Sequence, residues 1–297
     1  MKEFELRKAY QKEDGLRHSF NQLAYQTFGL DFEDWYQKGY WGENYIPYSI
    51  VVKGEVVANV SVNPMTFWEG EEKKHFIQLG TVMTRGDYRN QGLIRRLMEE
   101  IEKDYAGKAE GSYLFANSSV LEFYPKFGYE KEAEYQYSKK VWFDGERTAL
   151  KVPMKEKKDW DKLERAMRKS SRHSRFEMVD NGQLILFYVT KFMQENVYYI
   201  EECNSYVIAE IEDKNLLLHA VYCNESNASI LKSPVLDSVI QAFGKEIRMV
   251  TLGFVPVDEK GYTVSEFKQE DTTLFVKGKG FAGFKKLRLM FPTLSHA

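Results

Sequence analysis

The sequence predicts a two-domain α/β fold in which mixed sheets carry the helices. Segments with the two-residue period of strands alternate with helix-like segments along residues 1–143, and a weaker version of the same order follows. The length of 297 residues also exceeds the roughly 100–200 residues of one domain. We expect domains at residues 1–145 and 155–297, because the turn at Asp144-Gly145-Glu146 and the charged run 151–158 mark a boundary.

The first domain is predicted to open with a strand and two helices. Residues 3–9 alternate polar and apolar side chains, which is typical of a strand. Residues 13–30 place apolar side chains on one helical face, and a short helix should follow over 31–40 with Asp31 as its N-cap.

The central part of this domain is predicted to be strand-rich. Strands are expected at 49–53, 55–67 and 74–84, with a hairpin turn at Lys53-Gly54. A loop at 85–91 then leads into an amphipathic helix at 92–105. A strand at 112–116, a short helix at 119–127 and a strand at 135–143 complete the order.

The second half shows a similar order of elements. Helices are expected at 160–169 and 233–243. Strands are expected at 183–190, 197–201, 206–212, 216–222 and 248–255.

Composition and charge argue against several classes of protein. The net charge of -2 gives no basic surface for nucleic acid or an anionic membrane. The two cysteines, Cys203 and Cys223, form no CxxC pair, so neither a metal site nor a disulfide framework is indicated. The charged N-terminus lacks an apolar signal core, and apolar runs such as 184–189 are too short to span a bilayer. We expect a cytoplasmic protein.

One segment has the chemistry of a phosphate site. A buried strand ends at Thr84, a polar loop carrying Arg89 follows, and a helix starts near Gly92. The first turn of a helix has backbone N–H groups without intrahelical partners, and its dipole favours negative charge. Glycine there lets a ligand approach the backbone closely. The segment therefore predicts a phosphate-binding loop.

Residues 79–129 resemble the GNAT family of N-acetyltransferases. The family's pyrophosphate loop, Arg/Gln-x-x-Gly-x-Gly/Ala, falls on Arg89, Asn90, Gln91, Gly92, Leu93 and Ile94. Ile94 departs from the small residue at the last position, so its side chain must point away from the pyrophosphate. The run 92–98 is similar to that of the Eis acetyltransferases, a subgroup that tolerates a large apolar residue there.

A second segment, residues 115–129, is similar to the family's strand, short helix and Phe-Tyr-x-x-Phe-Gly-Tyr closure. The resemblance implies that Tyr124 is the general acid that protonates the leaving thiolate. It places Asn117 and Ser119 along the pantetheine arm. It also implies that backbone groups of Val82, Met83 and Thr84 meet this arm and the thioester carbonyl. The implied co-substrate is acetyl-coenzyme A, and no metal is expected.

The general base and the acceptor site are less clear from the sequence. His75 and Glu122 are candidate bases, although such residues are more often surface or structural. The acidic and aromatic stretch 31–43 falls where the family shapes its acceptor cleft, and acids with aromatics suit a cationic amine. The alternative to an acceptor site is that this stretch is an amphipathic helix, whose acid caps the helix and whose aromatic side chains belong to the core.

The second half resembles a degenerate second GNAT-like fold, as in the tandem arrangement of Eis-like enzymes. No Arg-x-x-Gly loop follows the strand 216–222, and residues 224–233 stand there instead, so no cofactor site is expected in this half. Eis-like members can use their C-terminal carboxylate in the active site, which leaves a role for Ala297 open. The GxGxxG match at 278–283 lacks room for a dinucleotide fold and is interpreted as a turn.

The sequence thus predicts an acetyl-CoA-dependent N-acetyltransferase that acts on a primary amine of a small molecule by direct attack in a ternary complex. Two alternatives remain open: a protein lysine or N-terminal acetyltransferase, and a non-catalytic coenzyme A-binding module. No nucleic acid or membrane partner is expected. The oligomeric state is open, with a homo-oligomer among the alternatives.

Overall fold

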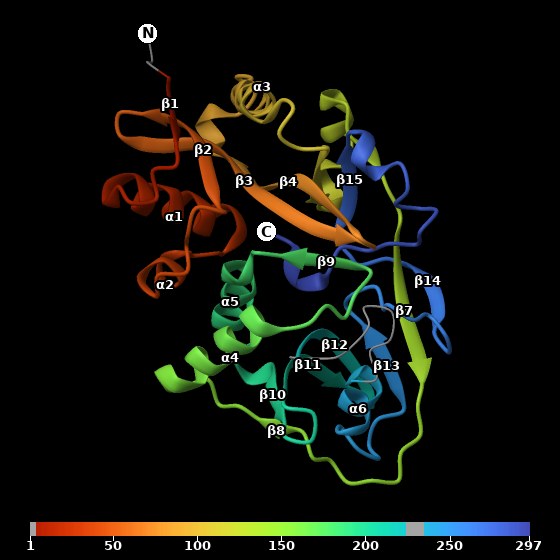
Figure 1. Cartoon of the computed structure of the whole chain (residues 1–297). Helices are drawn as coiled ribbons and strands as arrows, with labels where there is room; N and C mark the ends of the chain where they lie inside the picture. The colour runs from red at the N-terminus through yellow and green to blue at the C-terminus, as the bar shows by residue number, and fades with distance from the viewer. Residues whose placement is uncertain (1–3, 224–234) are drawn as a thin grey trace.

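The computed structural model describes residues 4–223 and 235–297. Within these ranges, two mixed sheets stand one above the other and the helices pack around them (Figure 1). This arrangement confirms the predicted α/β fold class. No helix in the described ranges is long and apolar enough to cross a membrane.

The first sheet has the strand order β1-β2-β3-β4-β5-β15-β6, and β9 pairs with β3. Its strands are β1 Glu5–Lys8, β2 Ile46–Val52, β3 Glu55–Glu69, β4 Glu72–Thr84, β5 Gly111–Ala116, β6 Glu130–Lys131, β9 Phe176–Val179 and β15 Thr273–Lys277. Most neighbours are antiparallel, whereas β4 and β5 are parallel and are connected through a helix. The hairpin turn predicted at Lys53-Gly54 joins β2 to β3 and is confirmed.

The second sheet has the order β14-β7-β13-β12-β11-β10-β8. Its strands are β7 Glu134–Lys140, β8 Leu150–Lys151, β10 Val197–Ile200, β11 Ser205–Glu212, β12 Asn215–Tyr222, β13 Met249–Leu252 and β14 Thr263–Phe267. The helices are α1 Asp14–Phe28, α2 Glu33–Gln37, α3 Leu93–Tyr105, α4 Lys157–Lys169, α5 Gly182–Lys191 and α6 Val235–Gln241. The predicted helix 233–243 thus appears as α6, while residues 233 and 234 lie outside the described part.

The two sheets exchange strands between the halves of the chain. Strand β7, from the first half, lies in the second sheet, while β9 and β15, from the second half, lie in the first. Strand β15 pairs with both β5 and β6 and so fills the space between them. The division into residues 1–145 and 155–297 stays a prediction, and the sheets themselves do not separate at that point.

The first sheet presents two differently covered faces. Helix α3 lies on one face, and α1, α2 and α5 lie on the other (Figure 1). Side chains alternate along β5: Leu114 packs in the cluster with α3, whereas Tyr113 packs in the cluster with Trp35 of α2. Helix α3 forms because Leu97, Met98 and Ile101 make one buried stripe at helical spacing.

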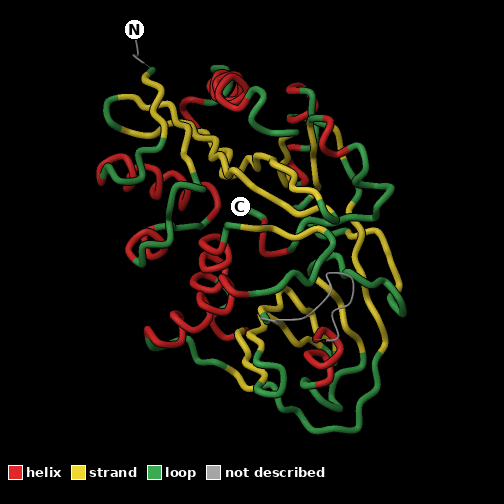
Figure 2. Tube along the Cα trace, in the orientation of Figure 1, coloured by secondary structure: helices red, strands yellow, loops and turns green. Residues whose placement is uncertain are grey.

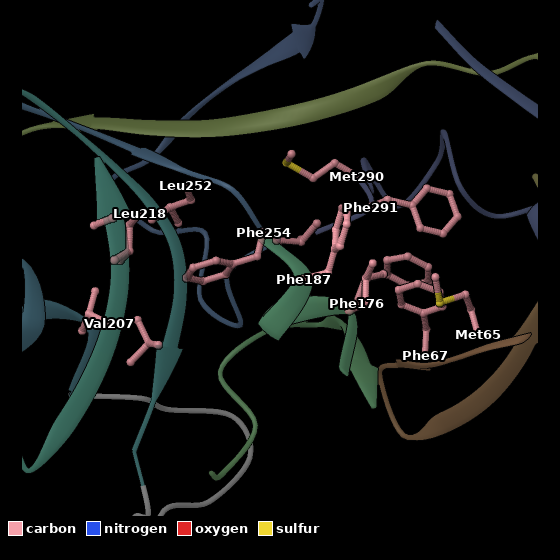
Figure 3. Packing of buried hydrophobic residues seen from close by; sticks show 14 of the residues in the cluster. Met65, Phe67, Phe176, Phe187, Val207, Leu218, Leu252, Phe254, Met290 and Phe291 are labelled. Carbon is pink, nitrogen blue, oxygen red and sulfur yellow. The ribbon is translucent and has the colours of Figure 1, made fainter. Parts of the chain in front are cut away.

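A continuous apolar core joins the two sheets. Phe67 of β3 stacks on Phe176 of β9 with ring centroids 4.6 Å apart, and Phe291 contacts both rings. Figure 3 shows this core continuing through Phe254 toward Leu218 of β12. Because the same cluster contains residues of both sheets, the sheets are packed as one body at this place.

Two predicted elements are wrong in type. Residues 183–190 form most of helix α5, not a strand. Their β-branched and aromatic side chains favoured a strand, but most of them are buried around the helix, and a helix that is apolar on nearly all sides is expected in a core. Residues 119–127 are mostly two short 3-10 turns, Ser118–Val120 and Tyr124–Phe127, where one helix was expected.

Candidate active site

A bulge in β4 lies at the centre of the candidate site. The pairing of β3 with β4 shifts register, so that Asn59 faces Met83 while Ser61 faces Gly80. The extra residue lets the chain bend there, and Thr81 takes a positive φ of 46° that a β-branched residue rarely adopts. The Asn59 amide donates to the Thr81 carbonyl at 2.9 Å, and the Tyr45 and Thr81 hydroxyls are hydrogen-bonded. The strain is thus held by specific partners.

Beyond the bulge, β4 and β5 separate. Their parallel pairing runs from Phe76–Gln78 on β4 to Gly111–Tyr113 on β5 and is not continued further along the described strands. Strand β15 pairs with Ser112 to Ala116 along the opposite edge of β5. None of the described strands therefore lies beside Val82, Met83 and Thr84 on the β5 side, and the backbone groups of this edge of β4 are available to an extended ligand.

The predicted phosphate loop lies directly after this edge. Arg89, Asn90, Gln91 and Gly92 are all exposed. Gly92 is the N-cap of α3 with a φ of 73°, and no side chain caps the helix. A Cβ at Gly92 would meet nothing within 4 Å. Among the described residues, no side chain therefore occupies the helix N-terminus as a cap, which fits an anion such as a pyrophosphate.

The two apolar residues of the loop point into the protein. Leu93 is buried and Ile94 is half-buried against the same cluster as Leu97 and Met98. The Ile94 side chain therefore packs into this cluster, under the loop. The Ile94 side chain therefore points away from the pyrophosphate site, as a large residue at this position of the family's loop must.

Tyr124 lies in the cluster on the α3 face. It is 6% exposed and starts the turn Tyr124–Phe127, with its ring 5.8 Å from that of Phe275. Burial raises the pKa of Tyr124 to about 12, so the phenol keeps its proton at neutral pH. A protonated phenol is the form required of a general acid.

Asn117 and Ser119 follow the carboxyl end of β5. Both are exposed, and the Ser119 hydroxyl donates to Asn117 Oδ1 at 2.7 Å. Because β4 and β5 are parallel, their carboxyl ends lie at the same edge of the sheet. Asn117 and Ser119 therefore stand at the end of the sheet where Thr84 and the phosphate loop also lie.

The two candidate bases lie elsewhere. His75 is exposed in the first part of β4, where its Nδ1 is 3.1 Å from Thr66 Oγ1. It is six residues before the bulged Thr81, which along a strand is about 20 Å. Glu122 is exposed after the turn Ser118–Val120. The structure gives neither residue a contact with the bulge.

The acidic stretch near α2 has structural partners. Glu33 pairs with Arg17 at 3.0 Å, and this guanidinium lowers the pKa of the Glu33 carboxyl. Asp34 pairs with Lys191 of α5 at 3.2 Å, and Trp35 is buried. The interpretation as a helix with core aromatics therefore describes this stretch better than an acidic acceptor pocket, although the N-cap of α2 is Phe32 and not Asp31.

A cavity of about 250 Å³ opens on the other face of the bulge. Its walls come from α2, α5, the bulge and the C-terminal segment, and they include Phe32, Trp35, Tyr45, Phe115, Phe187 and Tyr188. The sequence did not indicate that α5 would form a wall, because this segment was expected to be a strand. His296 also lines the cavity and stacks on Phe115 at 3.6 Å, and no motif pointed to it.

The C-terminal segment reaches the bulge from the second half of the chain. The label of the C-terminus in Figure 2 lies between the first sheet and the helices below it. Gln78 donates to the main-chain oxygen of Ala297 at 3.4 Å, and a Cβ at Gly80 would collide with this same oxygen. Glycine at position 80 is therefore required for Ala297 to lie against β4.

Comparisons with known proteins agree with this geometry. Residues 7–131 match the model of an acetyltransferase (GNAT) domain. A search of curated proteins found no matching sequence. A probable N-acyltransferase from Enterococcus faecalis V583 is similar over 95% of this chain and 74% of its own, with 16% identity and a TM-score of 0.59. Eis1 from Mycobacterium abscessus is similar over 92% and 73%, with 12% identity and a TM-score of 0.59. At these identities the solved structures show a shared fold.

Proposed function

Because residues 7–131 match the model of an acetyltransferase (GNAT) domain, we propose that this chain transfers the acetyl group of acetyl-coenzyme A to a primary amine of a small molecule. The observation that carries the proposal is the separation of β4 and β5 beside an uncapped helix N-terminus. A single extended ligand with a pyrophosphate at one end and a thioester at the other matches both features.

The residues of the α3 face hold the acetyl donor in this proposal. The N–H groups at Gly92 to Ile94 and the Arg89 guanidinium bind the pyrophosphate. The pantetheine arm runs between the β4 edge and Asn117 with Ser119. Backbone N–H groups in the segment Val82 to Thr84 donate to the thioester oxygen as it gains negative charge.

The reaction is a direct transfer. The lone pair of the neutral amine attacks the carbonyl carbon of the thioester, a C–N bond forms and the C–S bond breaks. The sulfur leaves with the bonding electron pair and takes the proton of the Tyr124 phenol, which regains a proton from solvent. The amine nitrogen loses a proton to water. Holding both reactants in one geometry supplies much of the rate enhancement.

The acceptor is placed on the face opposite α3. The cavity there begins at the Thr81 bulge and is closed by α5, so an acceptor in it reaches the thioester through the gap between β4 and β5. A volume of about 250 Å³ lies below the range of drug-sized pockets, about 300–1,000 Å³. This favours a small molecule over the alternative of a lysine side chain or N-terminus on a protein, which needs an open groove.

The alternative of a non-catalytic coenzyme A-binding module has less support. It rested on Ile94 and on the unidentified base. Ile94 packs into the cluster beneath the loop, so it does not obstruct the pyrophosphate site. The base remains unassigned, and water can accept the proton.

The test is thiol release from acetyl-coenzyme A over a panel of amines, comparing the wild type with Tyr124→Phe. We expect amine-dependent release that falls at least about tenfold in the variant at unchanged acetyl-coenzyme A affinity, because the thiolate then leaves without its acid. Tyr129→Phe is the matched control, since Tyr129 is also a buried phenol of this cluster and its hydroxyl is hydrogen-bonded to that of Ser112.

Each outcome of this test separates the parts of the proposal. Equal rates in the wild type and Tyr124→Phe would keep the transfer and remove the acid role. Binding of acetyl-coenzyme A without release, for every amine and peptide in the panel, would favour the binding module.

A further inference from the structure

The cavity beside Thr81 contrasts with the charged surface of the protein. The side chains that form it are mainly aromatic or aliphatic, among them Trp35, Leu184 and Phe187. No Asp, Glu, Lys or Arg side chain of the described residues lines it, but Ala297, the last residue of the chain, does. Among the described residues, an ammonium group bound in its depth would find a counter-charge at the C-terminal end of Ala297 and would otherwise meet neutral acceptors and ring faces.

The polar groups of the walls are already engaged with one another. The Tyr188 hydroxyl donates to the carbonyl of His296 at 2.6 Å, and Trp35 Nε1 donates to the carbonyl of Gln183 at 2.9 Å. The hydroxyl of Tyr45 bonds that of Thr81. These groups shape the cavity and have little remaining capacity to bind a polar ligand.

One side-chain atom is the exception. In the part of the chain that the structure describes, His296 Nε2 is buried and has no hydrogen-bond partner. Burial also lowers the pKa of His296 to about 3, so its ring is neutral at neutral pH and does not repel a cation. A buried unpaired polar atom is costly unless a ligand satisfies it.

The mouth of the cavity is aromatic as well. Phe28, at the end of α1, is 41% exposed, and Phe192, at the end of α5, is 55% exposed. Both line the cavity. Exposed large apolar side chains around a cavity mark a binding site for an apolar ligand. We call Phe28 and Phe192 the aromatic rim.

From these features we infer that the acceptor is a primary amine carried on a small aromatic body, an arylalkylamine, whose ring lies among the aromatic walls and whose nitrogen meets His296. This inference rests on the proposed function and narrows its acceptor. The ring gains edge and face contacts with Phe32, Trp35 and Phe187. A diamine or a polycationic sugar would bury a second charge without a counter-charge, which is unfavourable.

The experiment compares 2-phenylethylamine with 1,4-diaminobutane and an aminoglycoside, using the full chain. We expect kcat/KM for 2-phenylethylamine to exceed that for the diamine at least about tenfold. His296→Phe keeps a ring on Phe115 but removes the acceptor nitrogen. We expect it to raise the KM or Kd for 2-phenylethylamine about tenfold at an unchanged or higher Tm, whereas a merely structural histidine would leave these constants unchanged. His18→Phe on the exposed side of α1 is its control.

A second variant tests the aromatic rim without disturbing the core. Phe192→Asp should lower kcat/KM for 2-phenylethylamine at least about fivefold and raise that for 1,4-diaminobutane, because it adds a carboxylate at the mouth. Trp142→Asp is the control, since Trp142 is 72% exposed and does not line the cavity. A preference of the wild type for the diamine or the aminoglycoside would overturn the inference.

Binding separates this inference from the proposed function. Direct titration of 2-phenylethylamine, followed by the fluorescence of Trp35 in the cavity wall, needs no turnover. Acetyl transfer to other amines, with no binding of 2-phenylethylamine, would refute the inference and leave the acetyltransferase intact. If 2-phenylethylamine binds and His296→Phe weakens this binding, the inference about the acceptor is supported. If acetyl-coenzyme A does not bind in the same experiments, the proposed function is refuted, and the inference about the cavity still holds.

Discussion

At the scale of single residues, several buried polar groups carry specific structural tasks. Gln78 accepts a hydrogen bond from Tyr113 at 3.4 Å and donates to Ala297, so it links β4, β5 and the C-terminal segment. Asn59 holds the bulge through Thr81. These contacts connect positions far apart in the chain, and for that reason no local pattern of the sequence indicated them.

Glu134 gives a pH-dependent contribution to stability. It is fully buried at the start of β7, accepts a hydrogen bond from the Phe291 N–H, and has a pKa that burial raises to about 8. The folded protein therefore binds a proton that the unfolded chain loses near pH 4.5. The stability that this proton gives is complete below that pH and is lost as the pH rises toward 8.

Glu134→Gln should remove this loss, because an amide has the same shape and does not ionise. We expect the free energy of unfolding of the wild type to fall relative to the variant by at least about 1 kcal/mol between pH 5 and pH 8. Urea unfolding at both pH values measures this, and the exposed Glu130→Gln serves as control. Parallel pH profiles for the wild type and Glu134→Gln would show that Glu134 does not titrate in this window.

At the scale of elements, local sequence patterns correctly predicted segments that are buried on one face and exposed on the other. Helix α3 was predicted correctly because its apolar stripe and the glycine at its start are local features. Helix α5 was not, because nearly all its faces are covered by other parts of the chain, and a short apolar run does not distinguish a buried strand from a buried helix. The aromatic cavity wall was missed for the same reason.

Some elements of the predicted site could likewise be predicted from local sequence, and others could not. The phosphate loop was readable, since strand, polar loop and helix start follow one another directly. The separation of β4 from β5 was not predictable, because the point at which two strands stop pairing leaves no local pattern in the sequence. The acidic stretch of α2 was ambiguous, and its partners Arg17 and Lys191 decided its interpretation.

At the scale of the whole molecule, the two halves of the chain depend on each other. Strand β15 is the neighbour of β5 and β6, and β9 extends the pairing of β3. Phe275 of β15 is fully buried in the cluster that contains Tyr124, and Phe291 is fully buried between the sheets. The first half alone would leave these apolar surfaces open to water.

We therefore expect a fragment of residues 1–145 not to fold cooperatively, although it contains all the predicted donor-site residues. Near-UV circular dichroism and a urea titration measure this, with the full chain as reference. Mixing this fragment with residues 146–297 should restore a cooperative transition, because the missing strands are then supplied. A fragment that unfolds cooperatively alone and binds acetyl-coenzyme A would contradict this interdependence.

The most direct test of the central claim is a calorimetric titration of acetyl-coenzyme A into the full chain, repeated for Arg89→Ala and Arg96→Ala. Both arginines are exposed, but Arg89 lies in the phosphate loop whereas Arg96 lies in α3. We predict one binding site and an affinity about tenfold weaker in Arg89→Ala, as expected for one lost charge-assisted contact, with little change in Arg96→Ala. The absence of binding to the wild type, or equal affinities in all three proteins, would contradict the account.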